Sequence, residues 1–529
     1  MKRYMLLGIV SIVIIAIAAL GGYMYYQSSV PASEANKTLI IGSTDPMETT
    51  DPIRTHAYWD YVIATTIYDT LVRHSVDSVA IEPCLAENWT MLNNVTWDFY
   101  LRQNVKFHDG TPFNASCVKY SIDRAINDGE MSYTQDCISS IEVMSNYVVR
   151  FHLKYPCAYF LAVIACFNSA IVSPTALENL GDEAFNLNPV GSGPWKFESW
   201  RMGEELVLKA NKDYWDTEWT PKLDKIIIRF LGDSSTLKLA LEEGSIDVAE
   251  RYILPQDVAS LKSNPDVVAL PAVSGYIRVI SLDCSKPPFD NLLVREAFAY
   301  AINYTEIINK PLKGEAIRLL SAVSPAIFPE SSKSSFEKYQ QNITKAHELL
   351  TQAGYSDGVD IKLWYTPAHY GPVDGDIAVI VADSIKAAGF NAEIKTAEWG
   401  TYIQSIMAGT MTNAFQFGWI FDYPDPHTFI EGFYGNTSWL GGFGYYNNDT
   451  YTNETYVNEL LQKEMSEYDP VKRNALLGEL QDYMAETLHI IPLFSEKFYV
   501  FTRTNVKDLI VGPVHYTLGH ALAHAYKTS

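Results

Sequence analysis

Apolar positions recur along much of the chain with one of two periods, and they predict alternating strands and helices. Thr38–Ser43 alternates as a strand does, and Tyr58–Val72 then has apolar residues at helical spacing. Farther along, Val359–Tyr365 and Asn391–Thr396 have the pattern of strands, with a predicted helix, Asp376–Ala388, between them. This alternation is typical of α/β proteins, and it predicts a mainly parallel sheet with crossover helices in this part of the chain.

A different pattern holds between residues 86 and 187. Trp97–Leu101 and Tyr147–Leu153 alternate like strands, and Asn114–Ile126 is helical, with Asn114 as its N-cap. We therefore expect a small α+β unit inserted into a first lobe. The predicted domains are an N-terminal segment of residues 1–36, a first lobe of residues 37–280 and 496–529 that contains the 86–187 unit, and a second lobe of residues 281–495.

One apolar run, Ala414–Phe421, has the pattern of a buried strand and is followed directly by Asp422. Prolines at 424 and 426 stop the strand and restrict the path of the chain beyond it. Ligands usually bind at the carboxyl ends of strands in α/β sheets, so an acid placed there between aromatic residues is a candidate for holding a cationic group. The alternative is an Asx turn stabilised by the Asp422 carboxylate, a role that Asp425 fits better.

Length and charge narrow the class of protein. A chain of 529 residues is expected to form two or three domains. The net charge of −22 argues against a nucleic-acid partner, because phosphate binding needs a basic face and none is visible. Acidity alone does not identify a ligand, since it also keeps a protein soluble.

The N-terminus predicts a location outside the cytoplasm. Lys2 and Arg3 precede Met5–Tyr26, an uncharged run that reaches the roughly 20 residues needed to span a membrane. Positive residues before the span place the rest of the chain on the extracytoplasmic face. We expect an uncleaved anchor, and Val30–Ala32 leaves a cleaved signal and a secreted protein as the alternative. No cysteine precedes Cys84, which excludes a lipid-anchored N-terminal cysteine.

Two further features fit an external location. Nine Asn-x-Ser/Thr sequons suggest N-glycosylation, although Asn-rich turns would also produce some of them. They are Asn36, Asn88, Asn94, Asn114, Asn303, Asn342, Asn436, Asn448 and Asn453. The six cysteines contain no Cys-x-x-Cys pair, so zinc or redox chemistry is not expected. One or two disulfides and free buried thiols both remain open.

Several short motifs follow one another in order along the chain. They are Leu85–Thr90, Trp97–Arg102, Val105–Phe113, Pro189–Trp195, Asn211–Trp215, Gly244–Val248, Pro287–Asp290, Val294–Phe298 and Ala346–Tyr355. Together they resemble the large, peptide-type solute-binding proteins of ABC importers, a family of oligopeptide, dipeptide and nickel binders. The resemblance extends from about residue 38 to the C-terminus.

The resemblance implies a two-lobed, type II periplasmic-binding-protein-like fold that closes on its ligand like a hinge. It also implies that the chain captures short peptides outside the cell and delivers them to a separate permease and ATPase. A monomer without a cofactor and without covalent chemistry is expected.

The resemblance also assigns roles to individual residues. In peptide-binding members, an aspartate three residues after a tryptophan holds the ammonium group of the peptide, and Trp419 and Asp422 have that spacing. Trp419 would then line a pocket, with core packing as an equal alternative. Other implied ligand contacts are Trp399, which has the same two alternatives, the backbone at Gly418 and Tyr276, and Met47 in a closing loop. No partner for a ligand carboxylate is identified.

Nickel binders belong to the same family, so a nickel or metal-chelate ligand, or a small solute such as an oligosaccharide, is the alternative. His515, His520 and His524 near the C-terminus include a pair four residues apart, but no Asp or Cys ligand adjoins them, and we expect surface histidines rather than a metal site. His427 follows Asp-Pro as in some nickel-type relatives, which lack an acid at position 422. No enzyme is expected, because nucleophile-elbow, zincin, Walker and dinucleotide motifs are absent from the sequence. A glycosidase-like pair of carboxylates stays open, since the chain has many acids, but the sequence favours no particular pair.

Overall fold

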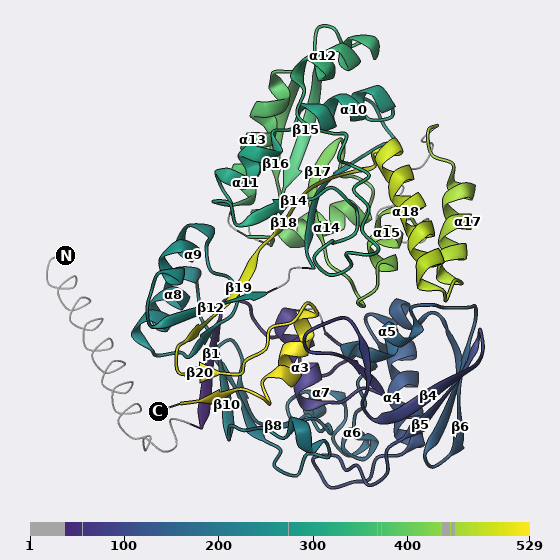
Figure 1. The fold of residues 1–529 in the computed structure, drawn as a ribbon, viewed down its shortest axis with the longest axis vertical. Helices are drawn as coiled ribbons and strands as arrows, with labels where there is room; N and C mark the ends of the chain where they lie inside the picture. The colour runs from purple at the N-terminus through teal and green to yellow at the C-terminus, as the bar shows by residue number, and fades with distance from the viewer. Residues whose placement is uncertain are drawn as a thin grey trace, which may run out of the picture.

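The computed structural model describes residues 37–528, apart from 56, 273–274, 368, 372, 436–444 and 446–449. The predicted anchor Met5–Tyr26 and its alternative cleavage site lie outside the described residues. Among the helices that are described, none is long and apolar enough to cross a bilayer. Figure 1 shows an upper lobe above a broader lower part that carries the C-terminus.

The first lobe is built on a seven-stranded sheet in the order β12-β19-β11-β1-β10-β9-β8. The strands are β1 (Thr38–Ser43), β8 (Trp195–Arg201), β9 (Glu205–Ala210), β10 (Lys225–Phe230), β11 (Val248–Ala249), β12 (Val267–Ala272) and β19 (Phe498–Arg503). β1 forms where its alternation predicts and pairs in parallel with β10. Helix α3 (Tyr58–Ile67) shares a hydrophobic core with β1 and also packs on the C-terminal helix α19 (Leu518–Ala521).

The predicted insertion contains a four-stranded antiparallel sheet in the order β4-β5-β7-β6. Its strands are β4 (Ala86–Asn93), β5 (Thr96–Leu101), β6 (Ile138–Ser145) and β7 (Val148–Leu153). Helix α4 (Ala115–Asp128) packs on this sheet, and the Asn114 side chain caps it by accepting from two backbone N–H groups. The short helices η1 (Ser132–Gln135), α5 (Phe160–Ala165), η2 (Phe167–Ser169), α6 (Pro174–Leu180) and α7 (Asp182–Asn186) complete the segment.

The second lobe is built on a six-stranded sheet in the order β14-β18-β13-β17-β15-β16. Its strands are β13 (Ile277–Leu282), β14 (Ala316–Arg318), β15 (Val359–Tyr365), β16 (Phe390–Thr396), β17 (Ala414–Trp419) and β18 (Ile490–Glu496). Its helices are α10 (Leu292–Ala301), α11 (Tyr304–Asn309), α12 (Ile343–Gln352), α13 (Asp374–Lys386), α14 (Trp399–Met407), α15 (His427–Tyr434), α17 (Glu454–Met465) and α18 (Pro470–Thr487).

The prediction of a mainly parallel sheet is wrong for this lobe. β15 runs parallel to β16 and β17, but β13 pairs antiparallel with β17 and β18, and β14 with β18. β13 and β18 are the strands that carry the chain between the two lobes, so their direction follows from that passage and not from a βαβ repeat. The predicted boundary at 280/281 falls inside β13, which belongs to the second sheet.

The structure shows the state of the cysteines and the roles of several sequon asparagines. All six cysteines are buried free thiols, which decides between the two alternatives that the sequence left open. Among the sequons, Asn36, Asn436 and Asn448 lie outside the described residues. Four others use their side-chain oxygen as a helix N-cap, which accounts for their presence without glycosylation. These four are Asn114, Asn303, Asn342 and Asn453.

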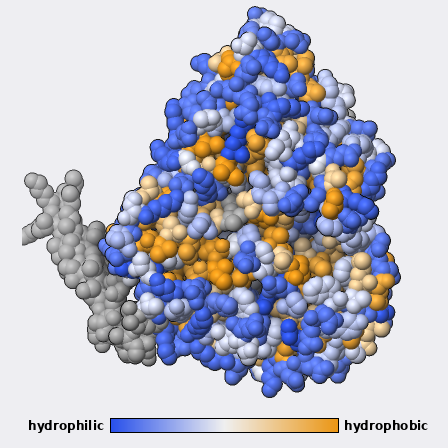
Figure 2. Space-filling view, viewed as in Figure 1, coloured by the Kyte–Doolittle hydropathy of each residue, from blue (hydrophilic) through white to orange (hydrophobic). Residues whose placement is uncertain are grey.

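The surface in Figure 2 is hydrophilic over the top of the upper lobe and along the bottom of the molecule. Apolar side chains gather across the middle of this face, where the two lobes meet. This distribution directs attention to the region between the lobes as the place where a ligand would be enclosed.

Candidate functional site

The turn after β17 is held rigidly by its own residues and by a distant arginine. The His427 N–H donates to the Asp425 carboxylate at 2.8 Å, and the Arg473 guanidinium donates to both oxygens of that carboxylate at 2.8 and 2.6 Å. Arg473 holds the pKa of Asp425 below its usual value against the opposing effect of burial. Asp425 is therefore the structural acid of this turn, as predicted, and Asp422 is not needed for that purpose.

Asp422 directs its carboxylate into a cavity while its backbone is fixed. Its N–H donates to the Thr428 hydroxyl at 3.3 Å, and the Cys166 thiol donates to its carbonyl at 3.2 Å. The carboxylate accepts a hydrogen bond from the Tyr133 hydroxyl, and no lysine, arginine or backbone N–H among the described residues is paired with it. Burial raises the pKa of Asp422 to about 7; the Tyr133 hydrogen bond lowers it and the charge of Glu431 raises it.

The cavity in front of Asp422 has a volume of about 990 Å³, at the upper end of the range for small-molecule sites. The inserted unit contributes one wall and the second lobe contributes the other. The lining residues from the insertion are Tyr133, Thr134, Asp136, Tyr155 and Tyr159. Those from the second lobe include Trp419, Asp422, Tyr423, His427, Thr428, Glu431, Gly435, four residues of α17 (Asn458, Leu461, Gln462 and Met465) and Ser466 directly after it.

Contacts across the cavity join the inserted unit to the second lobe. The Tyr159 ring stacks on Tyr423 with centroids 5.0 Å apart and on His427 with centroids 4.6 Å apart. The Ala158 N–H donates to the Met465 carbonyl at 2.7 Å. The two lobes are thus in contact on this side, as in a closed or partly closed state of a hinged protein.

Trp419 combines the two roles that the sequence left open. Its indole N–H donates to the Thr428 carbonyl at 3.1 Å, and its ring packs between Phe417 and Phe433. It is buried and also lines the cavity beside Asp422. Trp419 and Asp422, three residues apart, thus both line the same cavity: Trp419 forms part of its wall and Asp422 contributes a carboxylate.

Gly418 and Trp399 are linked to each other through Tyr370, which the sequence did not single out. The Tyr370 hydroxyl donates to the Gly418 carbonyl at 3.3 Å, and a Cβ at Gly418 would lie 2.7 Å from the Tyr370 ring. Trp399 stacks face to face on His369 with centroids 3.5 Å apart, and it contacts Tyr370 edge-on. Trp399 does not line the cavity around Asp422.

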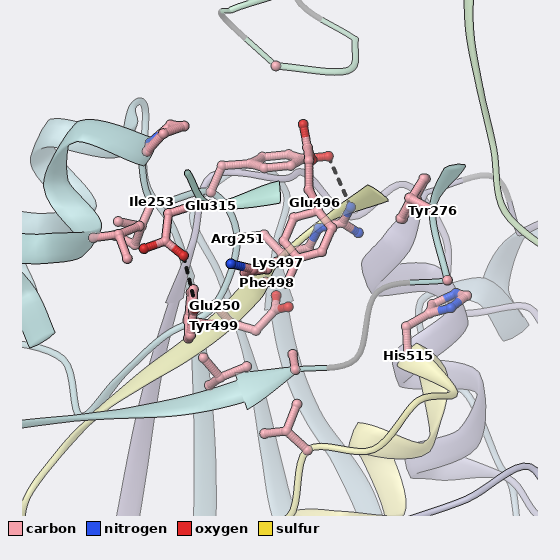
Figure 3. A pocket seen from close by; sticks show the side chains of 18 of the residues that line it. Glu250, Arg251, Ile253, Tyr276, Glu315, Glu496, Lys497, Phe498, Tyr499 and His515 are labelled. Atoms are coloured by element: carbon pink, nitrogen blue, oxygen red, sulfur yellow. Dashed lines mark hydrogen bonds between the residues drawn. The ribbon is translucent and has the colours of Figure 1, made fainter. Parts of the chain in front are cut away.

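Tyr276 lines a second, smaller cavity of about 120 Å³ where the chain passes between the lobes. Figure 3 shows Tyr276 and His515 on one side of it and Glu315 and Tyr499 on the other. The Arg251 guanidinium lies 5.3 Å from the Tyr276 ring centroid and donates to the Tyr252 hydroxyl at 3.0 Å.

Two of the carboxylates that line the same small cavity have raised pKa values. Burial raises the pKa of Glu250 to about 8 and that of Glu496 to about 7, and the nearby arginines lower both. Met47 lines neither cavity: it is 3% exposed in the core of the first lobe. Of the six predicted site residues, the structure thus brings Asp422 and Trp419 together and places the other four elsewhere.

The histidines are engaged in packing. His427 is hydrogen-bonded to Glu464, whose charge raises the pKa of His427 against burial. His520 was predicted to lie on the surface, but it is buried, and burial lowers its pKa to about 3. His524 stacks on Trp219 with centroids 4.1 Å apart. No group of three His, Cys, Asp or Glu side chains suited to a metal ion occurs among the described residues.

Three residues that line the cavity were not among the predicted site residues. Tyr133 lies in the short helix η1, and Tyr159 immediately precedes α5, so neither shows a periodic signal. Glu431 lies on α15, a helix absent from the elements predicted above, although Pro426 before it is a typical helix-start signal. A helix starting there places His427, Thr428 and Glu431 on one face.

Comparison with known proteins identifies the family of this chain. The family model "Bacterial extracellular solute-binding proteins, family 5 Middle" matches residues 80–441. The glutathione-binding protein GsiB of Salmonella typhi is 28% identical over 490 residues, which cover 90% of this chain and 93% of GsiB.

Solved structures with the same fold include two with contrasting ligands. DppA from Helicobacter pylori in complex with the peptide STSA is 26% identical, with a TM-score of 0.78 and coverage of 94% of this chain and 100% of DppA. NikZ from Campylobacter jejuni in complex with Ni(L-His) is 23% identical, with a TM-score of 0.77 and the same coverage of each chain. At that identity, the likeness to NikZ concerns the fold alone.

Proposed function

We propose that this chain, which belongs to the bacterial extracellular solute-binding proteins of family 5, captures short peptides by their amino end. It is the solute-binding component of an ABC importer. Similarity to a glutathione-binding protein and to a peptide-bound DppA supports a peptide as the ligand.

The observation that carries the proposal is the state of Asp422. Its carboxylate faces a cavity of about 990 Å³ and has a tyrosine hydroxyl but no described cation as its partner. An isolated buried carboxylate is costly, and a ligand ammonium group both neutralises it and donates hydrogen bonds to it. The same group lowers the pKa of Asp422 again, so that protein and ligand stabilise each other's charge.

The remaining predicted contacts keep narrower roles. Trp419 forms a wall beside the ammonium group. For Gly418 to pair with the peptide backbone, its carbonyl must exchange the Tyr370 hydroxyl for a peptide N–H, with Trp399 following Tyr370. Tyr276 would contact a ligand from the side of the small cavity, and Met47 would act only by supporting the closing loop of the first lobe.

The family supports an extracytoplasmic location, and the N-terminal sequence motivates the proposed anchor. The chain works on the extracytoplasmic face as a monomer without cofactor or catalysis, held by Met5–Tyr26 or released if that segment is cleaved. It transfers the peptide to a permease whose ATPase subunits are separate proteins.

Calorimetric titration tests the proposal. A free tetrapeptide such as Ser-Thr-Ser-Ala is expected to bind, while its N-acetylated form binds at least tenfold more weakly, the loss expected for one charge-assisted contact. Asp422→Asn, which keeps the shape of the side chain, should reduce binding of the free peptide by the same factor and leave the acetylated peptide unchanged. Absence of heat from every peptide, together with binding of Ni(L-His) or an oligosaccharide, would refute the proposal.

A further inference from the structure

Glu431 lies next to Asp422 because α15 packs directly on Trp419. A Cβ at Gly432 would lie 2.8 Å from the Trp419 ring, so the absence of a side chain there lets the helix approach. His427, Thr428 and Glu431 form the face of α15 that lines the cavity, and Gly435 directly after the helix also lines it. The position of Glu431 is therefore set by the same packing that positions Asp422.

Among the described residues, no lysine or arginine is paired with Glu431, although the charge of His427 acts to lower its pKa. Neither a hydrogen bond nor an ion pair to its carboxylate occurs among the described residues, and burial raises the pKa of Glu431. The other two charged groups of this wall have partners of their own: His427 is hydrogen-bonded to Glu464, and the Asp136 carboxylate pairs with Lys154 at 2.7 Å. No lysine or arginine is among the described residues that line the cavity.

The walls of the cavity suit a cationic ligand as well. Tyr133, Tyr155, Tyr159, Tyr423 and Trp419 present aromatic rings around the two carboxylates. Aromatic faces attract cations, and the attraction grows when water is excluded. One ammonium group neutralises one carboxylate, which leaves a second, partly buried carboxylate in the same cavity.

We propose that the cavity selects ligands with two cationic groups, in particular short peptides whose first residue is lysine or arginine. The inference rests on the proposed function: the α-ammonium group binds Asp422 and the basic side chain binds Glu431. Glu431 is then the residue that determines specificity for the first side chain. A volume of about 990 Å³ has room for a long basic side chain beside the peptide backbone.

A pair of peptides that differ in one charge tests the inference. Norleucine has a side chain close in shape to that of lysine but without the ammonium group, so Lys-Ala-Ala and Nle-Ala-Ala isolate its effect. We expect the wild-type protein to bind Lys-Ala-Ala about tenfold more tightly, in the range found for charge pairs at interfaces. Glu431→Gln should reduce this ratio to about one, mainly by weakening Lys-Ala-Ala.

The matched control is Glu459→Gln, which removes an exposed carboxylate of α17 that does not line the cavity. It should keep the tenfold ratio. Equal binding of both peptides by the wild type, or a preference that persists in Glu431→Gln, would overturn the inference and leave peptide capture intact. Binding of neither peptide would refute the proposed function itself.

The free diamine cadaverine tests whether the dicationic ligand is a peptide or a small diamine. It carries two ammonium groups but no peptide backbone, so it should bind more weakly than Lys-Ala-Ala. Tighter binding of cadaverine than of Lys-Ala-Ala would overturn the assignment to peptides.

Discussion

The affinity for a peptide should rise with pH over the range in which Asp422 loses its proton. Burial raises the pKa of Asp422 in the free protein to about 7. An ammonium group binds the ionised carboxylate and disfavours its protonated form, so binding below pH 7 requires Asp422 to release a proton. The affinity is therefore lost as the pH falls through the pKa of the free protein.

The size of the effect follows from that pKa. At pH 5, about 1% of a carboxyl group with a pKa of about 7 is ionised, and the affinity should be about 100-fold below its plateau. At pH 6 the expected loss is about tenfold. Above about pH 8, the peptide ammonium group, with a usual pKa of about 7.7–8.0, loses its own proton. The profile should thus be bell-shaped, with its maximum between the two pKa values.

Titration calorimetry with Nle-Ala-Ala, whose side chain is neutral, measures this profile. Repeating each titration in two buffers with different ionisation enthalpies counts the protons released. Asp422→Asn should have a flat, weak affinity below pH 7. Glu431 also has a raised pKa, so Glu431→Gln shows how much of the slope it contributes. A wild-type affinity that stays constant from pH 5 to pH 7, or an equal slope in Asp422→Asn, would refute the assignment of Asp422.

Two further substitutions probe how the site is held together. Gly432→Ala introduces a methyl group 2.8 Å from an indole ring, so we expect α15 to shift, with a loss of about 1–3 kcal/mol in the free energy of unfolding and weaker peptide binding. Gly400→Ala, on a helix with no atom within 4 Å, is its control and should be neutral or slightly stabilising by thermal unfolding. Tyr133→Phe removes a hydrogen bond that lowers the pKa of Asp422, so the midpoint of the pH profile should move up by about 1–2 on the pH scale. Tyr155→Phe should leave the midpoint in place, and an unmoved midpoint in Tyr133→Phe would contradict the hydrogen bond.

The elements that periodicity predicts well are those whose pattern is created by local burial. β1 and β15 form over the predicted residues, and α13 differs by two residues at each end. The predictions are wrong where the direction of a strand depends on how the chain passes from one lobe to the other. The predicted domain boundary placed the first four residues of β13 in the first lobe, although the whole strand belongs to the second sheet. The second sheet was expected to be mainly parallel but is mixed, because the alternation of side chains along one strand does not encode its direction relative to its neighbours.

Asp422 and Trp419 could be identified from the sequence because a strand, an acid and two prolines follow one another within a few residues. That local pattern determined where the chain ends its strand and which side chains lie at the end. The sequence also determined the two lobes, the inserted unit and the family, since these depend on ordered motifs spread along the chain.

The tertiary structure alone decided what faces Asp422. Tyr133 comes from the inserted unit, almost 300 residues earlier in the chain, and reaches the carboxylate only because the two lobes meet there. Glu431 becomes part of the same cavity through the contact between Gly432 and Trp419. Conversely, Met47, Trp399 and Tyr276 lie outside that cavity. The physical reason is that burial, charge pairing and pKa depend on neighbours in space, which residue spacing along the chain does not specify.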